Sequence, residues 1–397
     1  MIGPFGMTVK STMRERALPL AQALSRLGHS LTLLIPPWDS PEEAGTTYVV
    51  DGVTIINVGL PRVKGLFFYG GLTQTLVREA QRLSPDVIYF FKPKAYAGLS
   101  HAAFYYLRQA GIAGAQMIVD EDDWELAWNK LNNYSSLQKW VFAKQEPWGL
   151  QHADFVTVAS LALLDLVASL KVEQSRLHYL PNGVTQSQLK PMRPSQTSDN
   201  WVRAKYGLAE KPTVLLITRF FEFRLSLLQE VIKQVSTHLP DTHWLIVGQG
   251  YFGEEDALKF WGQEVNLSEK MIFTGWVEQS TLPDYYAAAQ VAIYPYDDTV
   301  LNRTKCSVKL LDMLARGMPV VASQVGQNAA YIRPDETGLL VPPDDAEAMA
   351  DAVCTMLTDA VLRDRLGETS HHYIAETYQW DLLARELENK VLNKNDN

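Results

Sequence analysis

Short apolar runs alternate with stretches of helical spacing along the first half of the chain. Apolar residues three and four apart in 12–27 and around 101–110 predict amphipathic helices. Between such stretches, compact apolar runs predict buried strands at 31–35, 53–58, 86–90, 116–119, 153–158 and 178–180. Strands that alternate with helices in this way predict a parallel sheet covered by helices on both faces.

The same alternation starts again after residue 200. Strand-like runs recur at 213–217, 244–247, 271–274, 291–294 and 319–322. Between the two series lies the turn Pro181-Asn182-Gly183-Val184, which a polar stretch follows. We therefore predict a first domain over 1–185, an interdomain linker over 186–200 and a second α/β domain over 201–377.

The first strand is expected to be unusual. Only Met1 and Ile2 precede the loop Gly3-Pro4-Phe5-Gly6, where a Rossmann-like half needs a central, buried strand. We expect either that Met1 is an internal methionine of a longer natural product or that this strand is reduced to a stub. Pro19 predicts a kink or a late start in the helix that follows.

Composition places the protein among globular, intracellular chains. With 397 residues, 47% hydrophobic and 20% charged, it can form two or three domains and is not disordered. Two cysteines cannot build a disulfide framework, no apolar run is long enough to span a membrane, and no signal peptide is recognisable. These features favour a cytoplasmic location.

Charge makes nucleic acid an improbable partner, because the formal net charge is -9. Residues 1–150 hold 14 basic and 13 acidic residues, so this half is nearly neutral and the rest carries the negative charge. That asymmetry fits a peripheral membrane contact by the first domain, although chance explains it about as well.

The run from Pro61 to Tyr69, with Arg62 and Lys64 among bulky apolar residues, suits a lipid acceptor or a membrane surface. A buried loop end with snorkelling cations is the alternative.

The segment 302–345 contains the most informative pattern. Ser307 and Lys309 open a short amphipathic helix that carries Asp312, Gly317 ends it, and the buried strand Pro319-Val320-Val321 follows. A helix N-terminus with a lysine and a hydroxyl group suits a phosphate, and a carboxylate one or two turns later suits a ribose diol. An ordinary βα unit with solvated charges would show similar spacing.

This segment resembles the donor-binding core of retaining GT-B glycosyltransferases of the family-four type. The resemblance covers nearly the whole chain and implies two doubly wound Rossmann-like parallel-sheet domains that face a central cleft. It also implies that the C-terminal segment, 378–397, crosses back to the first domain as a helix. In this family the donor is a nucleoside-diphosphate sugar and the chemistry is usually metal-free.

The residues around the other strand ends complete the predicted donor site. Arg219 and Arg224 directly follow the first strand of the second half, where two cations could grip a diphosphate; pairing with Glu222 or Glu230 on the surface is the alternative. The resemblance implies that the family's glycine loops and its segment near the base correspond here to Gly6, Gly248, Gly250, Gly275, Trp276 and Val277. Trp276 as a core residue remains an alternative to stacking on the base.

Three positions of the donor site depart from the family pattern. Arg224 stands where the family has a lysine. Asp312 takes the place of the glutamate that binds the ribose, and Thr304 takes the place of the glutamate that contacts the transferred sugar. In the first half, the acidic run 120–125 follows a predicted strand. We interpret Asp122 or Asp123 as a contact to the sugar or the acceptor, with solvated loop acids or a metal site as alternatives.

The sequence therefore predicts a retaining hexosyltransferase that uses a UDP-sugar or GDP-sugar and a lipid or saccharide acceptor, without a cofactor or a metal. Arg219 and Arg224 would stabilise the leaving phosphate, and Asp122 and Asp123 would act at the sugar. A nucleotide-sugar epimerase and a non-catalytic nucleotide-sugar-binding protein on the same fold are the alternatives.

Overall fold

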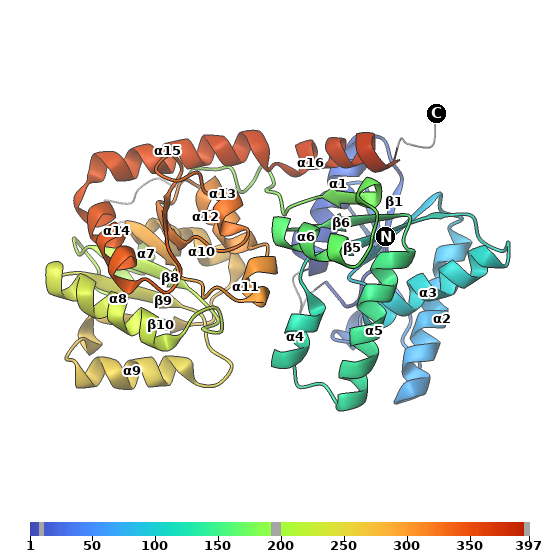
Figure 1. Cartoon of the computed structure of the whole chain (residues 1–397), viewed down its shortest axis with the longest axis horizontal. Helices are drawn as coiled ribbons and strands as arrows, with labels where there is room; N and C mark the ends of the chain where they lie inside the picture. Colours follow the sequence, from blue (N-terminus) through green and yellow to red (C-terminus); the bar gives the residue numbers. More distant parts are fainter. Residues whose placement is uncertain (8–11, 192–199, 393–397) are drawn as a thin grey trace. The chain divides into compact units, whose positions relative to one another are not determined.

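A computed structural model of the chain describes residues 1–7, 12–191 and 200–392. It divides the chain into two compact units (Figure 1). The first holds Met1–Gly183, Thr304–Cys306 and the segment that starts at Tyr378; the second holds Val184–Arg303 and Ser307–Thr377. Most of the predicted linker, residues 192–199, lies outside the described residues.

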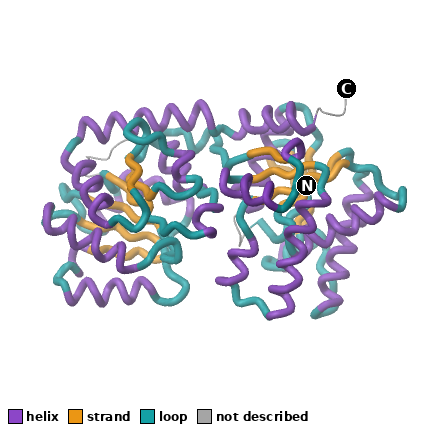
Figure 2. The backbone as a smooth tube through the Cα atoms, in the orientation of Figure 1, coloured by secondary structure: helices purple, strands orange, loops and turns teal. Residues whose placement is uncertain are grey.

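The first unit is an α/β structure, and Figure 2 shows its strands within a shell of helices. Its strands are β1 (Leu31–Ile35), β2 (Thr47–Val50), β3 (Val53–Asn57), β4 (Val87–Phe91), β5 (Gln116–Glu121), β6 (Phe155–Val158) and β7 (Leu177–Tyr179). Its helices are α1 (Leu18–Arg26), α2 (Leu66–Arg82), α3 (Ala95–Gln109), α4 (Glu125–Leu131), α5 (Ser136–His152), α6 (Leu161–Ser169) and α16 (Trp380–Leu387). A short π-helical turn (Met13–Ala17) runs directly into α1, and Pro19 is the second residue of α1. The amide of Leu18 donates to the carbonyl of Met13, five residues earlier, just before Pro19, which has no N–H to donate.

The predicted first strand is present as a stub of three residues. Ile2 forms parallel bridges to Leu34 of β1 and to Phe90 of β4. Its amide donates to the carbonyl of Tyr89 at 2.8 Å, and its carbonyl accepts from the amide of Phe91 at 2.9 Å. The stub therefore joins β2-β3-β1 to β4-β5-β6-β7, and the loop that starts at Gly3 leaves from the middle of the sheet.

The prediction of a purely parallel first sheet is wrong at its edge. β2, which the hydrophobic pattern did not indicate, pairs antiparallel with β3. The connection is the two-residue turn Asp51-Gly52, and both residues have positive φ, as the favoured hairpin turn requires. An Asp-Gly pair between β-branched residues was the available signal in the sequence.

The C-terminal helix α16 packs beside α1 in the first unit (Figure 1). Trp380 is 2% exposed in a core that includes Leu20 of α1 and Leu33 of β1. Arg26 of α1 also donates from Nε to the carboxylate of Asp381 at 2.9 Å. Burying such large apolar side chains stabilises the contact by about 2 kcal/mol each, whereas the exposed ion pair adds little.

The second unit contains one parallel sheet. Its strands are β8 (Thr213–Ile217), β9 (His243–Val247), β10 (Met271–Gly275), β11 (Val291–Tyr294), β12 (Val320–Ser323) and β13 (Leu339–Val341), in the order β10-β9-β8-β11-β12-β13. Its helices are α7 (Trp201–Lys205), α8 (Leu225–His238), α9 (Glu254–Glu264), α10 (Leu282–Ala287), α11 (Val300–Thr304), α12 (Val308–Ala315), α13 (Asn328–Tyr331), α14 (Ala346–Thr358) and α15 (Ala360–Thr377). The last residue of α11, Thr304, clusters with the first unit.

Both sheets have a topological switch point. In the second unit the chain adds β9 and β10 on one side of β8 and then β11, β12 and β13 on the other. In the first unit it adds β1 and β3 on one side of the Ile2 stub and β4 to β7 on the other. Ligands of open α/β sheets bind at the carboxyl ends of the strands next to such a point. Along the described ranges, no helix combines the length and the apolarity needed to cross a bilayer.

Candidate functional site

The carboxyl ends of β8, β9 and β10 form one closely packed edge in the second unit. The amide of Thr218 donates to the carbonyl of Val247, and the amide of Gly248 donates to the carbonyl of Gly275, both at 2.9 Å. Gly248 has φ +118°, and a Cβ atom there would lie 2.0 Å from the carbonyl oxygen of Thr218. Only glycine fits that position, so the close approach of the loops after β8 and β9 requires a glycine there.

The other two predicted glycines have different surroundings. The amide of Gly250 donates to the carboxylate of Glu255 at 2.9 Å, which ties its loop to α9. Gly275 has φ +67°, with open space where a Cβ atom would lie. Val277 is half-buried just beyond it.

Two cations meet one exposed indole at this edge. The guanidinium carbon of Arg219, on the loop after β8, lies 5.7 Å from the centroid of the Trp276 ring. Lys309, from the first turn of α12, places its Nζ 6.0 Å from the centroid of the same ring. Trp276 is 57% exposed, so its interpretation as a core residue is wrong. Two like charges on a solvent-facing aromatic ring are a suitable setting for an anion.

The N-terminus of α12 is organised by Ser307. Its Oγ accepts from the amide of Leu310 at 3.3 Å and also forms a hydrogen bond with the hydroxyl of Tyr294. One turn later, Oδ1 of Asp312 accepts from Nε of Arg316 at 3.1 Å and from Nε2 of Gln188 at 3.2 Å. A carboxylate has about four lone-pair sites, so these two contacts leave it able to accept from a diol.

Arg224 is held differently from Arg219. Its Nη2 lies 2.6 Å from the carboxylate of Asp344, and its Nε lies 3.7 Å from that of Asp297. The structure therefore brings Arg219, Gly248, Trp276 and Lys309 together and engages Arg224 with acids. In the part of the chain that the structure describes, the acids that pair with Arg224 are Asp344 and Asp297, whereas the sequence had suggested Glu222 or Glu230.

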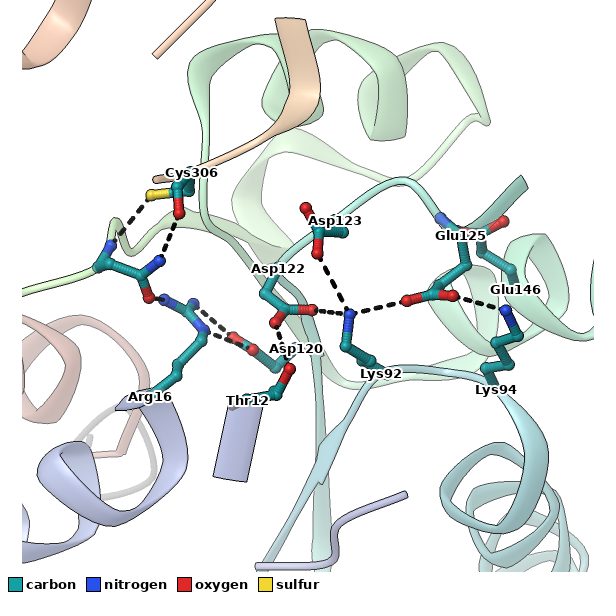
Figure 3. Close-up of polar contacts among 11 residues, drawn as sticks. Thr12, Arg16, Lys92, Lys94, Asp120, Asp122, Asp123, Glu125, Glu146 and Cys306 are labelled. Carbon is teal, nitrogen blue, oxygen red and sulfur yellow. Dashed lines mark hydrogen bonds and ion pairs between the residues drawn. The ribbon is translucent and has the colours of Figure 1, made fainter. Parts of the chain in front are cut away.

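The acidic run of the first unit surrounds a lysine (Figure 3). Lys92 follows β4, and its Nζ lies 2.6 Å from Asp122, 2.7 Å from Glu125 and 3.5 Å from Asp123. Asp122 also accepts from the hydroxyl of Thr12 at 3.1 Å. These carboxylates are therefore mostly paired rather than solvated, which corrects the alternative of loose surface acids.

A second lysine extends the cluster towards α4 and α5. Lys94 donates to the other oxygen of Glu125 at 2.6 Å. Burial disfavours the charge on Glu125, but Lys92 and Lys94 outweigh burial and lower its pKa to about 2. Glu146 of α5 accepts from the amides of Glu125 and Leu126 at 2.6 and 3.0 Å, and so caps the start of α4.

Three other carboxyl groups, those of Glu146, Asp123 and Glu121, have pKa values above their usual range, first because they are buried and then because neighbouring carboxylates disfavour another negative charge. Burial, followed by the charge of Glu125, raises the pKa of Glu146 to about 8. Burial also raises the pKa of Asp123, to about 6, although Lys92 opposes it. Glu121 is fully buried, and neither carboxyl oxygen has a hydrogen-bond partner in the described residues; burial raises its pKa well above the usual value.

Lys92 and Lys94 were not recognised from the sequence. The signal was present, because Lys92-Pro93-Lys94 directly follows a predicted strand, but only the pairing of β4 with β5 brings these lysines to the acids. As to metals, the described residues hold no group of three or more His, Cys, Asp or Glu that could bind an ion.

A buried ion pair between Arg16 and Asp120 adjoins the acidic cluster, because Asp120 begins the same acidic run. Arg16 makes two 2.7 Å hydrogen bonds to Asp120 and one of 3.1 Å to Asn182. The side chain of Asn182 in turn donates to the carbonyl of Cys306 at 2.8 Å. This chain of contacts holds the segment Thr304–Cys306 in the first unit.

Gly6 lies in the loop that leaves the Ile2 stub. Its amide donates to Oδ1 of Asp39 at 2.8 Å, and a Cβ atom at Gly6 would lie 2.7 Å from that oxygen. The loop after β1, which carries Asp39, therefore positions the glycine loop at the switch point.

The predicted cationic run 61–69 lines, together with Tyr96 of α3, an open aromatic pocket of about 470 Å³. Tyr69 and Tyr96 stack with their ring centroids 5.1 Å apart. Arg62 and Lys64 line the same pocket and are exposed. Exposed cations alone would also fit a buried loop end with snorkelling side chains, but Val63 and Phe67 are 49% and 80% exposed, so this loop end is not buried.

Comparison with protein families gives two matches, one to each half of the chain. A model described as glycosyl transferase 4-like domain matches residues 11–183. A model described as glycosyl transferases group 1 matches residues 211–359. Together they cover most of the chain.

The chain is also similar to individual known proteins. The chain is 26% identical over 231 residues to a GDP-mannose-dependent alpha-(1-6)-phosphatidylinositol monomannoside mannosyltransferase of Mycolicibacterium smegmatis; this covers 57% of the chain but only 59% of that relative, less than two thirds of its length. It is 25% identical over 398 residues to a phosphatidyl-myo-inositol mannosyltransferase of the same organism, which covers 98% of the chain and 91% of that protein. Among solved structures, Anabaena HepE in complex with UDP and glucose is similar in fold, with a TM-score of 0.71 at 15% identity over 99% of both chains.

Proposed function

This chain belongs to the GT-B glycosyltransferases of the family-four type, and from that premise we propose that it transfers a hexose from a nucleoside-diphosphate sugar to a hydroxyl acceptor with retention of configuration. The observation that carries the proposal is the convergence of Arg219 and Lys309 on the exposed ring of Trp276. It lies beside the switch point of the second unit, where a nucleotide is expected.

The donor is a UDP-sugar or a GDP-sugar. Arg219, Lys309 and the amides at the start of α12 hold its diphosphate, and Arg224 adds a second guanidinium when it exchanges Asp344 for phosphate. Asp312 accepts from the ribose hydroxyls. The base lies along Trp276 and Val277, and the glycine loops of Gly248 and Gly250 let the backbone approach the donor.

The reaction is a substitution on one face of the sugar. The bond between the anomeric carbon and the phosphate oxygen breaks, the bond from that carbon to the acceptor oxygen forms, and the departing phosphate takes the acceptor's proton. Arg219 and Lys309 stabilise the charge that develops on the phosphate, so the reaction proceeds without a metal or another cofactor. Asp122 and Asp123 contact the transferred sugar or the acceptor.

The acceptor is a lipid or a saccharide, as the names of the mannosyltransferase relatives suggest. The pocket with stacked Tyr69 and Tyr96 and exposed Arg62 and Lys64 suits an anionic headgroup or a sugar. The same face carries Phe67, which is 80% exposed. We therefore propose that the protein works in the cytoplasm, peripherally bound at the inner face of the membrane through its first unit.

The test is a calorimetric titration with UDP and GDP in EDTA, followed by a transfer assay with the corresponding sugars. We expect micromolar binding of one nucleotide and at least a hundredfold loss in Arg219→Ala, because the variant lacks a charge-assisted contact to phosphate. Lys233→Ala is the matched control, since Lys233 is a 63% exposed cation on α8 that pairs only with the exposed Glu230 among the described residues.

The product distinguishes the remaining possibilities. A transferred sugar with the anomeric configuration of the donor supports the proposal. An epimerised nucleotide sugar or free nucleotide with an epimerised sugar would indicate an epimerase, and tight binding without turnover would indicate a binding protein. Wild-type affinity in Arg219→Ala would refute the donor site.

A further inference from the structure

Lys92 occupies the switch point of the first unit. It is the first residue after β4, the strand that pairs with the Ile2 stub. Its backbone has φ +60°, a left-handed conformation that costs a residue with a side chain about 1 kcal/mol. The amide nevertheless donates to the carbonyl of Asp120 at 2.9 Å, so the turn is fixed to β5, and Figure 3 shows its ammonium among three carboxylates. Strain of this kind is retained where geometry matters.

The three carboxylates around Lys92 lie at different distances from its ammonium group and differ in exposure. Asp122 and Glu125 lie within 2.7 Å of Nζ and have side chains 10% and 9% exposed. Asp123 lies 3.5 Å away and is 25% exposed. Asp122 also accepts a hydrogen bond from the hydroxyl of Thr12, and Glu125 also accepts one from the ammonium of Lys94. Asp123 is therefore the member of the cluster that can turn an oxygen towards a ligand.

From this arrangement we propose that Lys92 is a positioning residue that keeps Asp123 ionised as a hydrogen-bond acceptor for a saccharide hydroxyl. The inference rests on the proposed transferase function and assigns Lys92 a role that the donor chemistry does not include. Lys92 does not touch the substrate; it acts through the charge of Asp123.

The charges around Asp123 show why a cation is needed. Burial, Asp122 and Glu125 all disfavour its ionised form, whereas Lys92 and then Lys305 favour it, and the result is a pKa of about 6. At pH 7 the group is ionised in the folded protein. Without Lys92 the carboxyl would stay protonated through neutral pH and lose the stronger, charge-assisted hydrogen bond.

Lys94 provides the matched control. It is a lysine two positions away, nearly as buried as Lys92, and it pairs with Glu125 but has no contact with Asp122 or Asp123 in the described residues. Removing either lysine takes one ammonium from the same cluster. Only the loss of Lys92 should change the titration of Asp123.

The experiment compares the wild type, Lys92→Met and Lys94→Met by ¹³C NMR titration of the Asp123 carboxyl, identified by its absence in Asp123→Asn. We expect the midpoint to rise by more than one pH unit in Lys92→Met and to stay within 0.3 unit in Lys94→Met. The pH profile of transfer should follow, with a loss of at least about threefold at pH 6.5 in Lys92→Met and an unchanged Kd for UDP or GDP. An unchanged midpoint in Lys92→Met, or equal shifts in both variants, overturns the proposal.

Two further variants decide the outcome if Lys92→Met does not fold. Lys92→Arg keeps the charge and should keep both the midpoint and transfer. Asp123→Asn should lose at least tenfold in transfer together with the pH dependence near 6, and a wild-type profile in this variant overturns the proposal. If no sugar is transferred by the wild type, the function has failed, whereas the NMR titration still tests what Lys92 does to Asp123.

Discussion

Asp122 and Asp123 are neighbours in the sequence whose surroundings separate their roles. The position of both acids after a strand predicts that they lie at the carboxyl edge of the sheet, as the structure shows. The partner of each could not be predicted, because Lys92 reaches them from a turn some thirty residues earlier that only the β4–β5 pairing brings close. The glycines of the second unit were more predictable, since a tight turn after a strand leaves few alternatives to glycine.

At this scale Gly248→Ala tests whether the glycine sets the geometry of the donor site. The new Cβ would lie 2.0 Å from the backbone of Thr218, next to Arg219, and the residue would have to keep φ +118°. We expect a loss of at least about 2 kcal/mol in the free energy of unfolding. Weaker nucleotide binding should accompany it. Chemical denaturation and calorimetry measure the two effects.

Gly253→Ala separates the clash from the backbone strain. Gly253 also has a positive φ, of +81°, but open space surrounds its Cβ position. This control should cost about 1 kcal/mol and leave nucleotide affinity unchanged. Equal effects of the two substitutions would show that the approach of Thr218 does not matter.

Individual strands were predicted well where a continuous apolar run in the sequence identified them. The strands at 31–35 and 213–217 coincide with β1 and β8, because buried parallel strands are continuous apolar runs. β2 was missed because its exposed residues lack that pattern, although Asp51-Gly52 signalled a hairpin. The start of α4 could not be predicted, because the group that caps it, Glu146, comes from another helix.

That cap makes the stability of α4 depend on pH. Burial and Glu125 raise the pKa of Glu146 from 4.5 to about 8, so the folded state binds its proton more tightly than the unfolded state. The resulting stabilisation is complete below pH 4.5 and is lost as the pH rises through 8. Between pH 6 and 8 we expect this group to lower the free energy of unfolding by up to about 1.4 kcal/mol per pH unit.

Glu146→Gln isolates this contribution. The amide keeps an oxygen that can accept from the start of α4 but cannot ionise, so the decline between pH 6 and 8 should be smaller than in the wild type. Urea denaturation at several pH values measures the difference. If the free energy of unfolding fell equally with pH in the wild type and in Glu146→Gln, Glu146 would not be the group that binds a proton on folding.

For the whole molecule, the hydrophobic pattern and the resemblance together predicted the GT-B fold, and the structure and family matches confirm it. At the place of the first strand, Ile2 bridges β1 and β4. The placement of Thr304–Cys306 in the first unit was beyond prediction. It depends on Asn182, more than 120 positions earlier in the chain, which binds Cys306.

The distribution of charge over the whole molecule leads to a prediction about membranes. The first 150 residues are nearly neutral in a chain of net charge -9, and their exposed Arg62 and Lys64 adjoin Phe67. We expect the protein to bind phosphatidylglycerol vesicles and to bind phosphatidylcholine vesicles much more weakly. Each cation near an anionic surface contributes about 1 kcal/mol, so Arg62→Gln with Lys64→Gln should weaken binding about thirtyfold.

The control changes the same total charge on the other unit. Lys233→Gln with Lys259→Gln removes two exposed cations of α8 and α9, whose partners are exposed acids. If overall charge governed binding, both double variants would lose affinity equally in a vesicle sedimentation assay. If Arg62 and Lys64 face the lipid, only their removal weakens binding, and the aromatic pocket they line is then held at the membrane surface, where a lipid acceptor would enter it.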